Sequence, residues 1–180
     1  MSSRRQFARA AGRGIVAGWL ATRWNEIESL LAQPPAASFQ FLQPADAADL
    51  EAMAAQIIPS DETPGAREAG VIHFIDRALT TFGREDQVVV RQGLNRVRAR
   101  IAKRWGSGVS FATLRSREQV ALLERLEKDD PEFFDFIRGA TIVGMFANPS
   151  RGGNRGKVGW RLIGFQDRFF WRPPFGDYDR

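Results

Sequence analysis

The sequence has no cysteine and a single histidine, His73, and these two scarcities exclude several classes of chemistry. Without cysteine the chain can form no disulfide, bind no iron–sulfur cluster through thiolates, attach no haem through C-x-x-C-H and offer no thiol nucleophile. With one histidine it cannot build a multi-histidine metal site. No stretch reaches the roughly 20 apolar residues that a membrane-spanning helix needs. The chain is therefore poorly equipped for catalysis by its own side chains.

Arginine, in contrast, is abundant. Lysine supplies only three of the 26 Lys and Arg residues, and the net charge is +5. Arginine suits bidentate pairing with carboxylates or phosphates and desolvated interfaces. The length of 180 residues and the hydrophobic fraction of 43% predict one domain with a real core.

Residues 1–33 form a basic, weakly apolar leader. The run S-R-R-Q-F at 3–7 matches the twin-arginine export pattern, and a modest apolar region, 14–21, follows it. Ala8 and Arg9 depart from the leucine and lysine that are common at those places. A mitochondrial presequence and a plain amphipathic first helix are the alternatives. We interpret the leader as an export signal, carried by Ser3, Arg4, Arg5 and Phe7.

Residues 34–44 are expected to form a linker, because prolines at 34, 35 and 44 disfavour helix. A helical domain is expected over 45–149. Its five predicted helices are one capped by Asp46 and ended by Pro59, one from Ala66 to Phe82, one from about Glu85 to Trp105, one begun by a capping box of Ser116 with Gln119, and one begun by Asp130-Pro131. The last is apolar nearly all round, which predicts the central helix.

The apolar residues of the first four helices recur at helical spacing, which predicts one buried face on each. The expected core residues are Leu50, Met53, Ala54 and Ile57, then Val71, Phe74, Ile75, Ala78, Leu79 and Phe82, then Val90, Leu94, Val97, Ile101 and Trp105, and finally Val120, Leu123 and Leu126. The predicted fold class is all-α, a small irregular helical bundle.

After Asn148 the composition changes. Residues 148–165 hold five glycines, and residues 166–180 are rich in aromatics. This pattern predicts an extended, ordered tail over 150–180. Its aromatics are too many to leave in water, so some should be buried, under this chain or under another one.

The run R-G-G-N-R-G-K-V at 151–158 is superficially like a phosphate-binding loop, but its spacing fails. The motif needs a glycine where Arg151 stands and Ser or Thr where Val158 stands. A glycine-rich turn with positive φ angles is the better interpretation.

Two other groups of residues are candidates for acid–base chemistry. Asp61 and Glu62 lie in a Pro/Gly-bounded turn, where a turn or capping role is the simpler explanation. His73, with Asp76 or Asp61, would be the candidate for a small enzyme. Because His73 falls opposite the apolar stripe of its helix, we expect it at the surface or at a subunit contact.

The arginine-rich stretch 85–105 could follow a phosphate backbone, and an arginine-rich nucleic-acid-binding helical module is the alternative function. The other interpretation is a surface helix whose arginines pair with acidic residues of a neighbouring helix. Counter-charges are offered by Glu118, Glu124, Glu127, Asp129, Asp130 and Glu132.

Two stretches carry a family resemblance. One is I-I-P-S-D-E-T-P-G-A-R-E-A-G-V at 57–71, and the other runs over 144–165 through G-M-F-A-N-P, G-G-N, K-V-G-W and I-G-F. Together they resemble the gluconate 2-dehydrogenase subunit 3 family, over about residues 45–165. This family comprises the small (gamma) subunits of bacterial FAD-dependent sugar, polyol and sugar-acid dehydrogenases, which commonly carry a twin-arginine signal.

The resemblance implies a non-catalytic subunit without a cofactor or metal of its own. FAD is expected in a large partner of the GMC oxidoreductase type, and haem c in a multihaem cytochrome c subunit where one is present. The large subunit typically lacks an export signal and is carried out with the small one. We therefore expect the twin-arginine translocase as a partner, no nucleic acid, and a periplasmic complex associated with the inner membrane.

The second stretch then becomes the candidate partner-binding segment. Its glycines would admit a partner's main chain, and its aromatics would anchor it, although folding back on the chain's own helices explains them equally well. The candidate residues are Asn148, Pro149, Gly152, Gly153, Asn154, Lys157, Trp160, Phe165, Phe169, Phe170 and Trp171.

Overall fold

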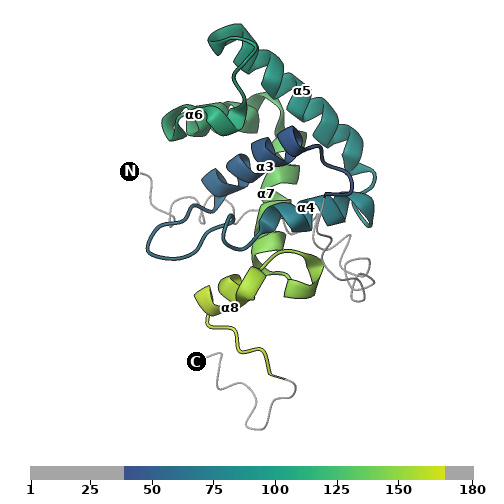
Figure 1. The fold of residues 1–180 in the computed structure, drawn as a ribbon, viewed down its shortest axis with the longest axis vertical. Coiled ribbons are helices and arrows are strands. Elements are labelled where there is room, and N and C mark those ends of the chain that lie inside the picture. Colours follow the sequence, from purple (N-terminus) through teal and green to yellow (C-terminus); the bar gives the residue numbers. More distant parts are fainter. Residues whose placement is uncertain (1–38, 169–180) are drawn as a thin grey trace.

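A computed structural model describes residues 39–168 (Figure 1). This part of the chain is helical and contains no strand, which confirms the all-α class. Labels follow Figure 1 and begin at α3. The α-helices are α3 (Pro44–Ile57), α4 (Val71–Thr80), α5 (Asp86–Trp105), α6 (Ser116–Asp129), α7 (Pro131–Phe146) and α8 (Val158–Leu162). Short 3₁₀ turns form η1 (Phe111–Thr113), η2 (Pro149–Arg151) and η3 (Arg155–Lys157).

The central helix is α7, as predicted. It contacts α3, α4, α5, α6 and α8, and it passes through the middle of the molecule in Figure 1. The approach of α5 is especially close, because a Cβ added at Gly93 would lie 2.2 Å from the ring of Phe133 on α7. A glycine at this crossing lets the α5 backbone lie directly on the ring.

The predicted core faces of α3, α4 and α5 are buried, except that Trp105 is half-buried. On α6 the prediction was wrong at Val120, which is 40% exposed. The buried face of α6 runs instead through Gln119, Leu122, Leu123 and Leu126. The apolar pattern does not predict a glutamine at a core position. Gln119 can occupy one because its amide is hydrogen-bonded inside the fold. Gln119 Nε2 donates to the Phe111 carbonyl at 2.9 Å.

The predicted capping box of Ser116 with Gln119 was therefore also wrong. Ser116 is the first residue of α6 rather than its cap. The carboxylate of Glu118 accepts the backbone N–H of Arg115 at 3.1 Å and pairs with its guanidinium at 2.7 Å. The reach-back carboxylate of a capping box exists, shifted by one residue toward the N-terminus.

Two other helix starts differ from the prediction. Pro44 is the first residue of α3 rather than the last of a linker, since a proline at the first helical position loses no hydrogen bond. Asp46 lies in the first turn of α3 without a capping bond. The second helix begins at Val71, not Ala66, because Gly70 takes a left-handed conformation with φ 66° and interrupts it.

The arginines of α5 pair with acids. Arg96 makes a bidentate contact with Asp130, with N–O distances of 2.7 and 2.9 Å, and this pairing raises the pKa of Arg96 further. Arg100 pairs with Asp129 at 3.0 Å. These two acids were among the predicted counter-charges.

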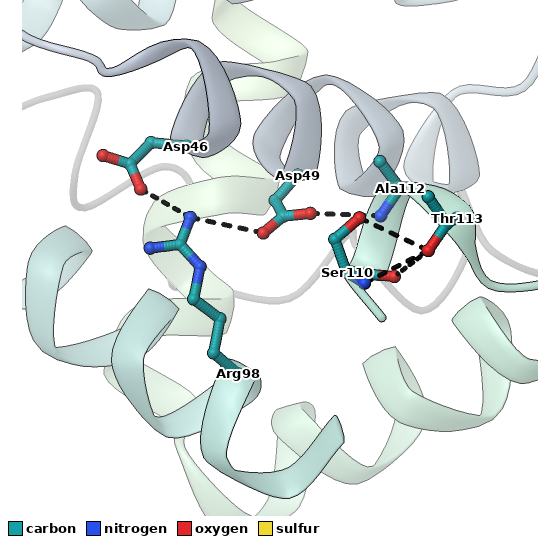
Figure 2. Close-up of polar contacts among 6 residues, drawn as sticks. All are labelled: Asp46, Asp49, Arg98, Ser110, Ala112 and Thr113. Carbon is teal, nitrogen blue, oxygen red and sulfur yellow. Dashed lines mark hydrogen bonds and ion pairs between the residues drawn. The ribbon is translucent and has the colours of Figure 1, made fainter. Parts of the chain in front are cut away.

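A third pairing joins α5 to α3, and sequence reasoning missed it. Figure 2 shows Arg98 between Asp46 and the buried Asp49. Asp49 also accepts the backbone N–H of Ala112 at 3.1 Å and so ties η1 to α3. Three arginines of the predicted basic helix thus pair with acids of neighbouring helices, as the paired-helix alternative predicts.

The chain after α7 turns back on the bundle. Between Pro149 and Leu162 it forms η2, η3 and α8, and α8 packs on the end of α7 (Figure 1). The extended conformation predicted from residue 150 onward is thus wrong as far as Leu162. Among residues 39–168, no helix has the length and apolar character to cross a membrane.

Candidate partner interface

The turn between α7 and α8 is organised by one buried side chain, that of Asn154. Its Nδ2 donates to the Ala147 carbonyl at 2.8 Å, and its Oδ1 accepts the N–H of Gly159 at 2.8 Å. Asn154 is fully buried and has φ 46°, a left-handed conformation that asparagine tolerates better than most residues. Both bonds of the Asn154 amide are thus made to backbone groups of its own chain.

Glycines let this segment lie against the bundle. A Cβ at Gly153 would stand 2.1 Å from the Gly144 carbonyl oxygen, and one at Gly159 would stand 1.9 Å from that of Met145. Gly152 has φ 99° and lies against the backbone of His73. The main chain that approaches these three glycines is therefore the chain's own, which is the fold-back interpretation of the glycine-rich motif.

The two stretches that carried the resemblance meet in space. The backbone N–H of Arg155 donates to the Ala69 carbonyl at 2.9 Å. The guanidinium of Arg155 covers Gly70, where an added Cβ would lie 3.3 Å from it. Arg77 of α4 adds a bond from Nη1 to the Ser150 carbonyl at 2.7 Å. The two motifs thus form one structural unit around the start of α4 and the end of α7.

This unit ends in a run with four large apolar residues, the half-buried Trp160 and the exposed Leu162, Ile163 and Phe165, which we call the apolar face. The exposed fractions of Leu162, Ile163 and Phe165 are 39%, 60% and 49%. They are three of the five large hydrophobic side chains that are exposed in the described part of the chain. Sequence reasoning named Trp160 and Phe165 but missed Leu162 and Ile163, although the run R-L-I-G-F after a glycine-rich turn was a visible signal.

Two contacts fix the shape of the apolar face. The indole of Trp160 donates from Nε1 to the Phe146 carbonyl at 2.7 Å, which ties it to the end of α7. The ring of Phe165 lies tilted against that indole with 5.0 Å between centroids. A preordered aromatic pair costs little entropy when it is buried by a partner.

The apolar face lies in a stretch of the chain with net positive charge, whose charged residues we call the positive rim. Residues 155–168 contain four basic residues and one acidic residue. All five charged side chains are exposed, and they are Arg155, Lys157, Arg161, Asp167 and Arg168. Lys157 pairs with Asp167 at 2.7 Å. The net positive rim predicts a partner surface of opposite charge.

The remaining predicted interface residues lie at η2 or outside the described part of the chain. Asn148 is exposed, and its side chain accepts the N–H of Ser150 at 3.0 Å, while Pro149 begins η2. Phe169, Phe170 and Trp171 lie outside the described residues, as do the export-signal residues Ser3, Arg4, Arg5 and Phe7.

The candidate catalytic groups have structural partners. The carboxylate of Asp76 accepts three backbone N–H groups, from Gln40, Phe41 and Leu42. Asp61 accepts the N–H of Thr63 at 2.9 Å and so closes its own turn. No group of three or more potential metal ligands occurs among residues 39–168.

His73 is half-buried, and its ring stacks on Phe39 with 5.4 Å between centroids. Burial lowers the pKa of His73, and the nearby positive charge of Arg155 lowers it further, against the opposing effects of Glu51 and Asp76. His73 is therefore outside the core, as expected, but it is covered in part by Phe39 of its own chain rather than fully exposed.

We expect His73 to make the fold acid-sensitive. Because its pKa is lower in the folded state than in the unfolded state, the unfolded state binds the proton more readily. The free energy of unfolding should therefore fall as the pH drops below about 6.5, the ordinary pKa of histidine. His73→Phe keeps the stacking and removes the titration, so urea unfolding between about pH 7 and pH 5 should show a smaller loss of stability. An unchanged pH slope would contradict this assignment.

Glu68 titrates in a separate window. The Ser60 hydroxyl and the N–H of Gly65 lower its pKa, so its stabilising effect is lost only below its ordinary pKa of about 4.3. The two effects can thus be distinguished in one pH series.

Comparison with protein families gives one match. The family model of gluconate 2-dehydrogenase subunit 3 matches residues 44–167, which include both motifs and all of the described helices. Neither the curated proteins nor the solved structures contain a match to the chain. The expected family is confirmed over more than half of the chain, and the chain belongs to the gluconate 2-dehydrogenase subunit 3 family.

Proposed function

We propose that this protein is the non-catalytic small subunit of a periplasmic, FAD-dependent sugar or sugar-acid dehydrogenase, and that it folds with, stabilises and escorts the catalytic subunit. The observation that carries the proposal is the family match over residues 44–167. The twin-arginine pattern at 3–7 supplies the export part of it.

The docking site in this proposal is the apolar face with its positive rim. Its occupant is the large flavoprotein of the GMC type, which would present an apolar depression bordered by acidic residues. The ordered Trp160–Phe165 pair and the exposed Ile163 are suited to anchor such a contact, because large side chains at the centre of an interface dominate its energy. Lys157, Arg161 and Arg168 would steer the approach.

Catalysis belongs to the partner in this proposal. FAD would be held by the large subunit, and a multihaem cytochrome c subunit, where present, would carry electrons onward and keep the complex at the inner membrane. What supports a non-catalytic role here is that the carboxylates of Asp76, Asp49 and Asp130 are engaged in holding helices and turns together. The ring of His73 stacks on that of Phe39.

Docking can be tested with one charge introduced into the apolar face. Ile163→Asp should raise the Kd for the flavoprotein subunit about 30-fold, which corresponds to about 2 kcal/mol, because it places a carboxylate in an apolar contact with an acidic surround. Co-purification and titration of the two purified subunits would measure it.

Val88→Asp is the matched control. Val88 on α5 is 60% exposed, as Ile163 is, and lies outside residues 155–168. It should leave the Kd unchanged. Equal losses for the two variants, or none for Ile163→Asp, would contradict the assignment of the docking face.

A further inference from the structure

The segment 39–42, which lies within the predicted linker 34–44, is fastened to α4 by one carboxylate. Asp76 is 4% exposed. Its Oδ2 accepts the backbone N–H of Gln40 at 2.8 Å, and its Oδ1 accepts those of Phe41 and Leu42, each at 2.9 Å. Three N–H donors on one carboxylate make a strong, charge-assisted attachment. We call this arrangement the Asp76 clasp.

Side chains of the same segment add three more attachments. Phe39 stacks on His73 of α4 with an angle of 20° between the rings. The guanidinium of Arg91 on α5 lies 4.8 Å from the centre of the Phe41 ring. Leu42 is 4% exposed and belongs to the core. The side chains of Phe39, Phe41 and Leu42 are thus all packed against the bundle. Phe41 and Leu42 are also held by their backbone N–H groups.

The clasp depends on folding. Asp76 is 34 to 36 residues away in sequence from the amides that it holds. The intervening chain includes α3, which packs on α4. Closing so long a loop costs entropy that only the packed helices offset, so the clasp cannot form in an unfolded chain. An endopeptidase needs a segment that leaves its hydrogen bonds and adapts to the active site, and the clasp withholds residues 39–42 from it.

We propose that the Asp76 clasp protects residues 39–42 from proteolysis once the chain has folded, and we call this protection the guard. It confines proteolytic removal of the leader to peptide bonds before Phe39, and we call the chain between the leader and residue 42 the leader junction. The guard closes when α3 and α4 pack together. A chain that is exported folded would then be processed between the twin-arginine motif and Phe39, and the segment from Phe39 onward would remain with the mature subunit. The biological meaning of the junction rests on the proposed export function, whereas the guard itself is a property of this chain alone.

Limited proteolysis of the purified full chain tests the guard. Chymotrypsin should cut after Phe39, Phe41 and Leu42 on the order of tenfold faster in Asp76→Asn than in the unsubstituted chain, because cleavage follows the population of the open segment. Asp49→Asn is the control. It alters an equally buried carboxylate that also accepts a backbone N–H, that of Ala112 in η1 (Figure 2). Equal cleavage at the junction in both variants would overturn the proposal.

Two measurements need no substitution. Amide hydrogen exchange of the full chain should protect residues 40–42 to the same degree as α4, and exchange at the rate of free chain would overturn the guard. The N-terminal residue of the exported protein should be Phe39 or an earlier residue, and an intact leader agrees with this. An N-terminal residue after Phe39 would overturn the proposal. Proteolysis and exchange use this chain alone, so their failure leaves partner docking standing, and failed docking leaves them unaffected.

Discussion

Gly159→Ala is expected to detach the segment between α7 and α8 from the bundle. The added Cβ would stand 1.9 Å from the Met145 carbonyl oxygen and 2.9 Å from its carbon, both of which are backbone atoms of the central helix. Neither side can yield cheaply, and a shift would also break the bond from the Gly159 N–H to Asn154. We expect a loss of about 3 kcal/mol in the free energy of unfolding, measured with urea.

The same variant should lose protection from hydrogen exchange over residues 147–162 before the rest of the bundle does. Gly108→Ala is the control, because an added Cβ there meets nothing within 4 Å. It should change stability by a few tenths of a kcal/mol at most, which is about the effect of an ordinary surface substitution. If Gly159→Ala proved as harmless as the control, the close approach described for this turn would be wrong.

Arg4→Lys combined with Arg5→Lys is expected to abolish export of this chain and of its catalytic partner together. The twin-arginine route tolerates paired lysines badly, and the exchange preserves the net charge of the leader. Both subunits should therefore accumulate inside the cell, with FAD bound to the catalytic one. The dehydrogenase activity in the periplasm should fall to background. Fractionation with immunoblots against both chains measures this outcome.

The charge-preserving exchange also separates this account from the nucleic-acid alternative, since binding to phosphate backbones would change little. A matched exchange at Arg9 and Arg13, outside the motif, should leave export intact. Equal effects of the two double variants would show that general basicity, rather than the motif, directs the chain.

Much of the fold could be predicted because the signals for it were local. The apolar stripes of α3, α4 and α5 recur at helical spacing, and Asp130-Pro131 marked the start of α7 correctly. On α6 the prediction failed because a tertiary contact had replaced a local one. Gln119 is buried because Gln56 and the Phe111 carbonyl satisfy its amide, and a one-dimensional pattern assigns such a residue to the surface.

The candidate interface was predicted only in part, because only its aromatic residues left a local signal in the sequence. Trp160 and Phe165 were named because aromatics after a glycine-rich run need cover, and the structure places them side by side. The glycines and Asn154 could be interpreted equally as contacts to a partner or to the chain itself. The distances from Gly153 and Gly159 to the α7 backbone and the two hydrogen bonds of Asn154 show that they serve the chain's own packing. The Asp76 clasp left no signal, since its donors are backbone amides more than 30 residues away.

The most direct test of the escort function is to produce the catalytic flavoprotein with and without this chain and to measure soluble, FAD-loaded flavoprotein in the periplasm. The account predicts that the flavoprotein is exported and active only when this subunit is present with its leader. It also predicts that Ile163→Asp lowers the exported amount more than Val88→Asp does. An equal periplasmic yield of FAD-loaded flavoprotein in the absence of this chain would contradict the central claim.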